Sequence, residues 1–171
     1  MHYGRIVIVV GAVLGAIGFL PQSASSNGEE LLPALSQASD AFPSGFDNTF
    51  MALYNDTAAA AVVYLIAAVA ALGTVFMPPF KEAQTRLLAL TATVLGVLML
   101  AIAAFATMGA ADDASTLQNG FAEAAAGGLI PPADYTVSIG FGWYLMILAG
   151  VVVAVGGVLG LMARPNESAL D

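Results

Sequence analysis

Cysteine is absent from this chain of 171 residues, histidine occurs once, and lysine and arginine together number four. The lack of cysteine excludes disulfides, thiolate metal sites, iron–sulfur clusters and a cysteine nucleophile. The single histidine, His2, precedes the first apolar segment, so the sequence offers no pair of axial ligands for a haem held between helices. Four cations are too few for the basic surface that nucleic acids require.

What the chain has in excess is apolar residues, which make up 59% of it, while charged residues make up 9%. The mean hydropathy is +0.86, beyond the range of a soluble domain. We therefore predict an all-α membrane protein, a four-transmembrane-helix bundle that forms a single domain of residues 1–171. The spanning helices are expected at about residues 4–20, 57–77, 87–109 and 139–163. No ionised side chain is expected in their apolar segments, the first of which runs from Ile6 to Leu20. Pro78 and Pro79 end the second helix, and Arg164 and Pro165 end the fourth.

The distribution of charge predicts the orientation. The four cations, Arg5, Lys81, Arg86 and Arg164, all fall on one side of the four predicted helices. The two opposite connections, residues 21–56 and 110–138, contain no cation and nine carboxylates: Glu29, Glu30, Asp40, Asp47, Asp56, Asp112, Asp113, Glu123 and Asp134. The positive-inside rule then places both termini in the cytoplasm and the acidic loops outside a bacterial plasma membrane.

One alternative concerns the first apolar segment. Arg5 before an apolar run, with small residues at Ser23, Ala24 and Ser25, is also the pattern of a cleaved signal peptide. The length of the run favours a retained helix.

Short amphipathic helices are expected in both outer loops. Asn27 is a candidate N-cap, and the apolar residues that follow it at helical spacing are Leu31, Leu35, Ala38 and Phe42. Asp47 or Asn48 can cap a further turn that leads into the second spanning helix. In the second loop, Ser115 and Gln118 have capping-box spacing, and Gly127 with Gly128 ends the helix. These apolar stripes either seal the outer end of the bundle or dock on a partner.

Close helix packing is predicted from small residues, because lipid supplies no hydrophobic force between helices. Gly11, Gly15 and Gly18 share one helix face, and Gly156 and Gly160 repeat the GxxxG spacing. This spacing serves either packing inside the bundle or contact with another copy or a partner helix. An interfacial aromatic belt is expected where the fourth helix begins, formed by Tyr135, Phe141, Trp143 and Tyr144.

Catalytic, cofactor-binding and metal-binding patterns are not found in the sequence. No Ser-His-Asp set or phosphate-binding loop is present. Asp112 and Asp113 lie next to each other near Ser115, but the spacing fits no calcium loop and indicates a solvated turn. Ion-coupled transporters generally carry charged groups inside the membrane, and the predicted spans lack them. We therefore expect no cofactor.

The topology is similar to that of claudins and tetraspanins, but those families carry cysteines in their outer loops, so no residue role can be transferred. The helices rich in Ala, Gly and Val, the cysteine-free acidic loops and the stretch from Gly140 to Leu145 resemble small bacterial four-helix membrane proteins. The chain is most similar among these to accessory subunits of the supercomplex of menaquinol–cytochrome c reductase and cytochrome oxidase. The resemblance implies a cofactor-free subunit of the respiratory chain, next to cytochrome-containing electron-transport partners.

Three functions follow from the sequence. The leading one is a non-catalytic accessory or scaffold subunit of a larger membrane complex. The chain has a large apolar helix surface and no recognisable catalytic, cofactor-binding or metal-binding pattern. A small channel or carrier would need oligomerisation to line a polar path. An enzyme acting on lipid or cell-envelope substrates would have only the carboxylates of the outer loops as acid or base.

Overall fold

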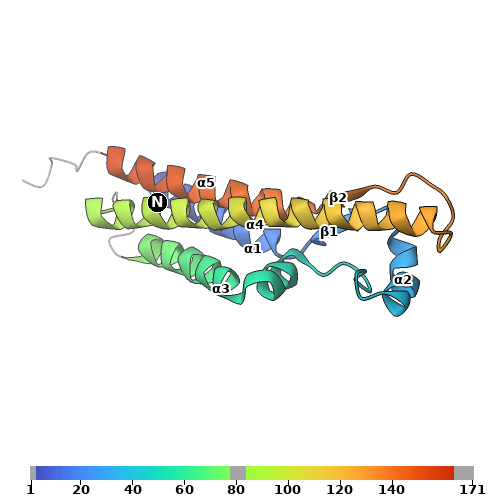
Figure 1. The fold of residues 1–171 in the computed structure, drawn as a ribbon. Helices are drawn as coiled ribbons and strands as arrows, with labels where there is room; N and C mark the ends of the chain where they lie inside the picture. Colours follow the sequence, from blue (N-terminus) through green and yellow to red (C-terminus); the bar gives the residue numbers. More distant parts are fainter. Residues whose placement is uncertain (1–2, 78–83, 164–171) are drawn as a thin grey trace, which may run out of the picture.

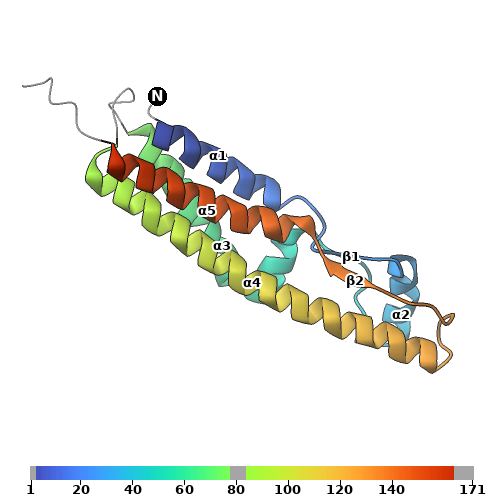
Figure 2. The same ribbon diagram turned by 90° about the horizontal axis from the view of Figure 1, so that it is seen from above.

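Four apolar helices lie side by side in the computed structural model, which describes residues 3–77 and 84–163 (Figures 1 and 2). They are α1 (Tyr3–Gly18), α3 (Thr49–Phe76), α4 (Arg86–Ala126) and α5 (Phe141–Met162). Helix α5 packs against α1 on one side and α4 on the other, and α3 packs against α4 and α1. The predicted helix-ending residues Pro78, Pro79, Arg164 and Pro165, the cation Lys81 and His2 lie outside the described residues.

Three of these helices, α3, α4 and α5, are long and apolar enough to cross a membrane. This confirms the prediction of a helical protein with segments that could span a membrane. Helix α1 is apolar but has only 16 residues, about 24 Å at 1.5 Å per residue, which is shorter than the usual span. One face of it carries exposed apolar side chains, those of Ile6, Val10, Val13 and Ile17, while Ile8 is buried in the bundle. An apolar outer face is what contact with lipid requires.

The bundle core combines a few large side chains with many small ones. Tyr64, Met99, Met146 and Val153 are fully buried at its centre. The Tyr64 hydroxyl donates to the backbone oxygen of Met146 at 3.1 Å, which joins α3 to α5. This bond satisfies the one polar atom of a side chain that is otherwise surrounded by apolar groups.

Helix α3 starts eight residues earlier than the predicted span. The Asn48 side chain accepts a hydrogen bond from the backbone N–H of Met51 at 2.8 Å, so Asn48 is the N-cap, as one of the two predicted candidates. At Thr57 the backbone leaves the helical region, with φ −145° and ψ 88°. The first turns and the spanning segment therefore meet at a kink (Figure 1).

Helix α4 contradicts the predicted boundary at residue 109. It continues without a break to Ala126, over 41 residues and about 60 Å. The capping box predicted at Ser115 and Gln118 is wrong: the Ser115 hydroxyl donates to the Asp112 oxygen within the helix, and the Gln118 side chain accepts from Val137 N–H. Residues 110–126 are rich in alanine and lack proline, so nothing there stops a helix. The predicted end is confirmed, with Gly127 as C-cap.

The far part of α4 belongs to a second structural unit, which we call the lobe (residues 21–48 and 110–140). It also holds β1 (Ala24–Ser26), a 3-10 turn (Glu29–Leu31), α2 (Leu32–Ala38) and β2 (Val137–Ile139). Strands β1 and β2 pair antiparallel, with Ala24 opposite Ile139. The two strands, at three residues each, were not predicted from the sequence.

A separate apolar core holds the lobe together. It contains Leu32, Leu35, Phe121, Ala124 and Ile130, from α2, α4 and the segment after α4. The stripe predicted in the first loop thus packs within the protein through Leu35. Asn27 is not an N-cap: its side chain donates to the Asp134 oxygen and accepts from Thr136 N–H, both at 2.9 Å, which ties the two connections together.

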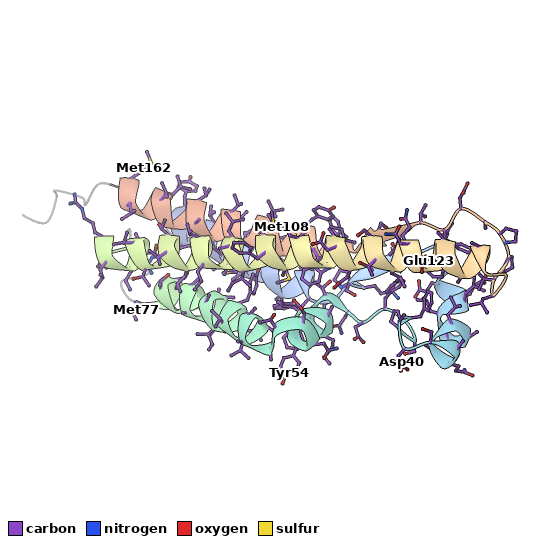
Figure 3. All side chains as sticks on the ribbon, viewed as in Figure 1. Asp40, Tyr54, Met77, Met108, Glu123 and Met162 are labelled. Carbon is purple, nitrogen blue, oxygen red and sulfur yellow. The ribbon has the colours of Figure 1, made fainter. Side chains whose placement is uncertain are left out.

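The bundle and the lobe give the molecule two distinct ends. Met77 and Met162 mark the end of the bundle where α3 and α5 finish, which we call the terminal end (Figure 3). Asp40 and Glu123 lie at the opposite end, in the lobe (Figure 3).

Candidate functional site

The junction between the bundle and the lobe is fixed by backbone hydrogen bonds. The Ser23 oxygen accepts from the Gly140 N–H at 2.7 Å and from the Trp143 indole N–H at 2.9 Å. The Pro21 oxygen accepts from both the N–H and the hydroxyl of Thr49, at 2.8 and 3.0 Å. The segment after α1 is thereby held against the starts of α3 and α5. A defined surface results at the point where the helices leave the bundle.

A groove of about 310 Å³ opens at this junction, and we call it the lobe groove. It lies among both strands, the segment before α3, the first turns of α3, the middle of α4 and the start of α5. Its lining is Ser23, Ala24, Ala41, Pro43, Phe46, Ala52, Asp56, Ala106, Ala110, Asp113, Ala114, Thr116, Leu117, Val137 and Trp143. This volume is within the range of small-molecule sites.

The groove is mostly apolar, with two carboxylates in its wall. Asp56 comes from α3, next to the kink, and Asp113 comes from α4. Both residues are exposed. Within the described residues, Asp56 Oδ2 has one long side-chain contact, with the Thr57 hydroxyl at 3.5 Å. No Lys or Arg occurs between Arg5 and Lys81, or between Arg86 and Arg164, so the sequence places no cation near these two acids.

A different polar cluster lies at the terminal end of the bundle. The Arg5 Nη1 donates to the backbone oxygens of Val75 and Met77, at 2.8 and 2.9 Å. The Gln84 amide donates to the oxygen and hydroxyl of Thr74, at 3.0 and 3.1 Å. These two side chains join α1 and the start of α4 to the last turn of α3, whose carbonyl groups lack helical partners.

Arg5 corrects the prediction that the helices contain no ionised side chain. It lies inside α1, not before it, and is only 1% exposed. The partial negative charge at the C-terminus of α3 faces the guanidinium group and favours it there. Arg5 Nε and Gln84 Oε1 are buried without a hydrogen-bond partner among the described residues.

The predicted packing glycines lie mainly between α1 and α5. A side chain on Gly11 would come within 2.7 Å of Val153, and one on Gly18 within 3.0 Å of Met146. A side chain on Gly156 would come within 2.7 Å of Ile8. A Cβ on Gly15 would lie 3.0 Å from the Tyr64 hydroxyl. A Cβ on Gly160 would lie 3.0 Å from both Ala89 Cβ and the Gln84 amide oxygen. These five glycines are therefore positions of close helix contact.

A second set of glycines brings α4 against α5, and those on α5, Gly150 and Gly157, were not predicted from the sequence. A Cβ on Gly150 would lie 2.5 Å from the Leu100 backbone nitrogen. Gly157 faces Thr93 and Gly96 faces Ala154 at similarly close range. Gly150 and Gly157 are seven residues apart, which is two helical turns, and this spacing is the signal that a search for GxxxG alone overlooks.

The four predicted interfacial aromatic residues have different surroundings. Phe141 and Tyr144 are exposed at the start of α5. Trp143 is only 3% exposed, because it turns toward Ser23 and the lobe groove. Tyr135 stacks on Phe121 in the lobe, with ring centroids 5.1 Å apart. Trp143 and Tyr135 thus pack within the protein, because contacts with distant residues, Ser23 and Phe121, cover them, while Phe141 and Tyr144 face outward.

No protein-family model, curated protein or solved structure matches this chain. Its function is therefore argued from its own residues. Within residues 3–77 and 84–163, no three His, Asp or Glu side chains are grouped closely enough to hold a metal ion. Among the described residues, the lobe groove and the Arg5–Gln84 cluster are two places where polar groups lie against the helix bundle.

Proposed function

We propose that the protein is a non-catalytic accessory subunit, which holds a rigid acidic lobe next to a larger complex in a bacterial plasma membrane. The observation that supports this best is helix α4, one unbroken helix of 41 residues that belongs to both the bundle core and the lobe core. A shared helix prevents the lobe from swinging freely on a linker. Such a part positions other proteins, whereas a catalytic lid needs mobility.

The proposal includes a fourth membrane span. Helix α1 packs along α5 from Gly4, next to Gly156, to Gly18, next to Met146. It therefore lies at the same depth as α5, and α5 is long enough to cross. Phe19 and Leu20 extend its apolar length. The outer faces of all four helices carry exposed apolar residues, which suit lipid or the helices of another subunit.

The orientation belongs to the same proposal. The described cations, Arg5 and Arg86, lie at the terminal end, while the nine carboxylates lie in the lobe or beside it. By the positive-inside rule, the terminal end is cytoplasmic and the lobe is outside. A basic partner domain would be attracted to a face with this charge. Cytochrome-containing respiratory complexes are the first partners to test, because the chain resembles their accessory subunits in size and in the composition of its helices and loops.

The test is to tag the chromosomal gene, purify the protein in mild detergent from its native membrane and identify what is recovered with it. We expect the subunits of one large membrane complex in fixed ratio. Deleting the gene should destabilise that complex on native gels, while its catalytic subunits are still made. If every large complex is unchanged and the pure protein moves an ion or solute into liposomes, a carrier replaces the accessory subunit as the best proposal.

The helix that contacts the partner can be found with matched variants. A tryptophan replaces one exposed apolar residue on each helix, at Val13, Ile66, Val94 or Val155. Three of the four variants should co-purify with the complex like the unaltered protein, because their new side chain faces lipid. The variant on the contact face should accumulate normally but lose the complex.

A further inference from the structure

Two hollows adjoin at the kink of α3. The second, which we call the kink hollow, has a volume of about 320 Å³ and lies between α3 and α4. Its lining is Leu53, Asp56, Thr57, Ala60, Ala101, Ile102, Phe105 and Ala106. It shares Asp56 and Ala106 with the lobe groove, so the two hollows meet at these residues.

The hollows exist because α3 and α4 do not pack tightly here. The non-helical backbone at Thr57 redirects α3, so its first turns and its spanning segment cannot both follow α4. The facing side chains are small, with Ala60 on α3 and Ala101 and Ala106 on α4. Elsewhere the interior is packed closely, with glycines against backbone. The space is therefore local to the kink.

The two hollows differ in what they offer an occupant. The kink hollow is lined mainly by apolar side chains and reaches the outer surface of the bundle, where Phe105 is 76% exposed. The lobe groove shares the Asp56 carboxylate with it and adds the carboxylate of Asp113 and polar groups from Ser23 and Thr116. An occupant that fills both has an apolar part on the bundle side and a polar part on the lobe side.

We infer that the lobe groove and kink hollow bind a membrane amphiphile with a positively charged head. Its hydrocarbon chain lies along α3 and α4 in the kink hollow, and its head lies between Asp56 and Asp113. Charge complementarity selects the sign of the head: the lobe and its base carry nine carboxylates, and no Lys or Arg occurs in their sequence. An anionic head would meet like charge and would be repelled.

The protein contains its own reporter for this site. Trp143 is the only tryptophan in the chain, and it lines the lobe groove. A nitroxide quenches indole emission only at short range. A hexadecyl dimethylammonium amphiphile with a TEMPO nitroxide on its head should therefore quench Trp143 when it binds. The protein is held in phosphatidylcholine nanodiscs, and the probe is added in increasing amounts.

The first comparison uses the unaltered protein and three probes that differ only in the head. Cationic, neutral and phosphate-bearing TEMPO amphiphiles with the same hexadecyl chain all enter the nanodisc. We expect saturable quenching with the cationic probe at a concentration about tenfold lower than with the other two. Equal quenching by all three probes would mean simple partition into lipid and would overturn the inference.

The second comparison uses variants. Asp56→Asn and Asp113→Asn should each raise the half-quenching concentration of the cationic probe about threefold, and the double variant about tenfold. Asp134→Asn removes an equal charge from the lobe at a residue that does not line the groove, and should have little effect. If Asp134→Asn weakens quenching as much as the other two, the effect is one of general charge and the site is not where we place it.

Discussion

Arg5 joins two helices whose bonded residues are 70 positions apart in the chain. Its guanidinium group occupies the place where the carbonyl groups of Val75 and Met77 would otherwise lack partners. A charged donor on a buried carbonyl forms a stronger hydrogen bond than a neutral one. Arg5 is therefore both a topological signal and a structural clamp.

Replacing Arg5 with methionine should lower the stability of the bundle. The change leaves two carbonyl groups without their donor, and we expect a loss of about 2 kcal/mol. Thermal unfolding of the detergent-solubilised protein measures it as a lower midpoint. Arg5→Lys should be intermediate, because lysine keeps the charge but lacks the planar fork of donors.

The matched control is Arg86→Met, at an exposed arginine at the same end of the bundle. It removes the same charge without breaking a hydrogen bond that joins helices. Equal midpoints of thermal unfolding for the Arg5 and Arg86 variants would contradict the stabilising role of the Arg5 hydrogen bonds.

Whether the burial of a side chain can be predicted from the sequence depends on how distant its contacts are along the chain. The position of Arg5 near one end follows from its place in the chain, but its burial depends on carbonyl groups 70 positions away. Trp143 shows the same limit, since Ser23, its hydrogen-bond partner, is 120 positions away. In both cases the position in the chain predicts which end of a helix the side chain occupies, and contacts with distant residues decide whether it is buried.

At the scale of helices, the glycines of α1 and α5 determine how closely the two backbones approach. Gly11→Ala should destabilise the bundle, because the new methyl group would lie 2.7 Å from Val153 Cγ2 and 2.8 Å from its backbone nitrogen. We expect a loss of about 1–3 kcal/mol, seen as a lower midpoint of thermal unfolding in detergent.

Gly73→Ala on α3 is the control with the opposite expected sign. A Cβ there has nothing within 4 Å, and alanine favours a helix by about 1 kcal/mol over glycine. The midpoint should stay the same or rise. A similar fall for both variants would mean that helix flexibility, and not close packing, is what these glycines provide.

The boundaries of the helices show which ends can be predicted from the sequence and which cannot. Near residue 110 the composition changes from apolar to polar, and this change predicted the end of the helix. It marks a change of surroundings instead, because alanine-rich residues continue the helix. The ends at Asn48 and Gly127 were predictable, since a side-chain cap and a C-terminal glycine are local features. The strands were not, because each is stabilised by the other across more than a hundred residues.

At the scale of the whole molecule, the described cations, Arg5 and Arg86, and the nine carboxylates of the lobe and its base lie at opposite ends. The prediction that follows is testable with single cysteines, because the chain has none of its own. Ser44→Cys and Ser115→Cys lie at exposed positions of the lobe, and both should react with a membrane-impermeant maleimide in intact cells. Glu82→Cys, between α3 and α4 in the sequence, should react only after the membrane is permeabilised.

Gln84 would be an unsuitable position for this experiment, because it is only 5% exposed and would be protected on either side of a membrane. Reaction at Glu82→Cys in intact cells, together with protection of both lobe positions, would reverse the proposed orientation. Reaction of all three would indicate leakage or mixed insertion.

The unbroken length of α4 has a mechanical consequence. If α4 crosses the bilayer as proposed, about 30 Å of its roughly 60 Å lies in the hydrocarbon layer and the other half extends beyond it. A tilt of about 10° about the bilayer midplane then displaces the tip of α4, about 45 Å away, by about 8 Å. Membrane helices change tilt when bilayer thickness changes. On that placement, a change in the tilt of α4 would move the lobe sideways, together with any partner that it contacts.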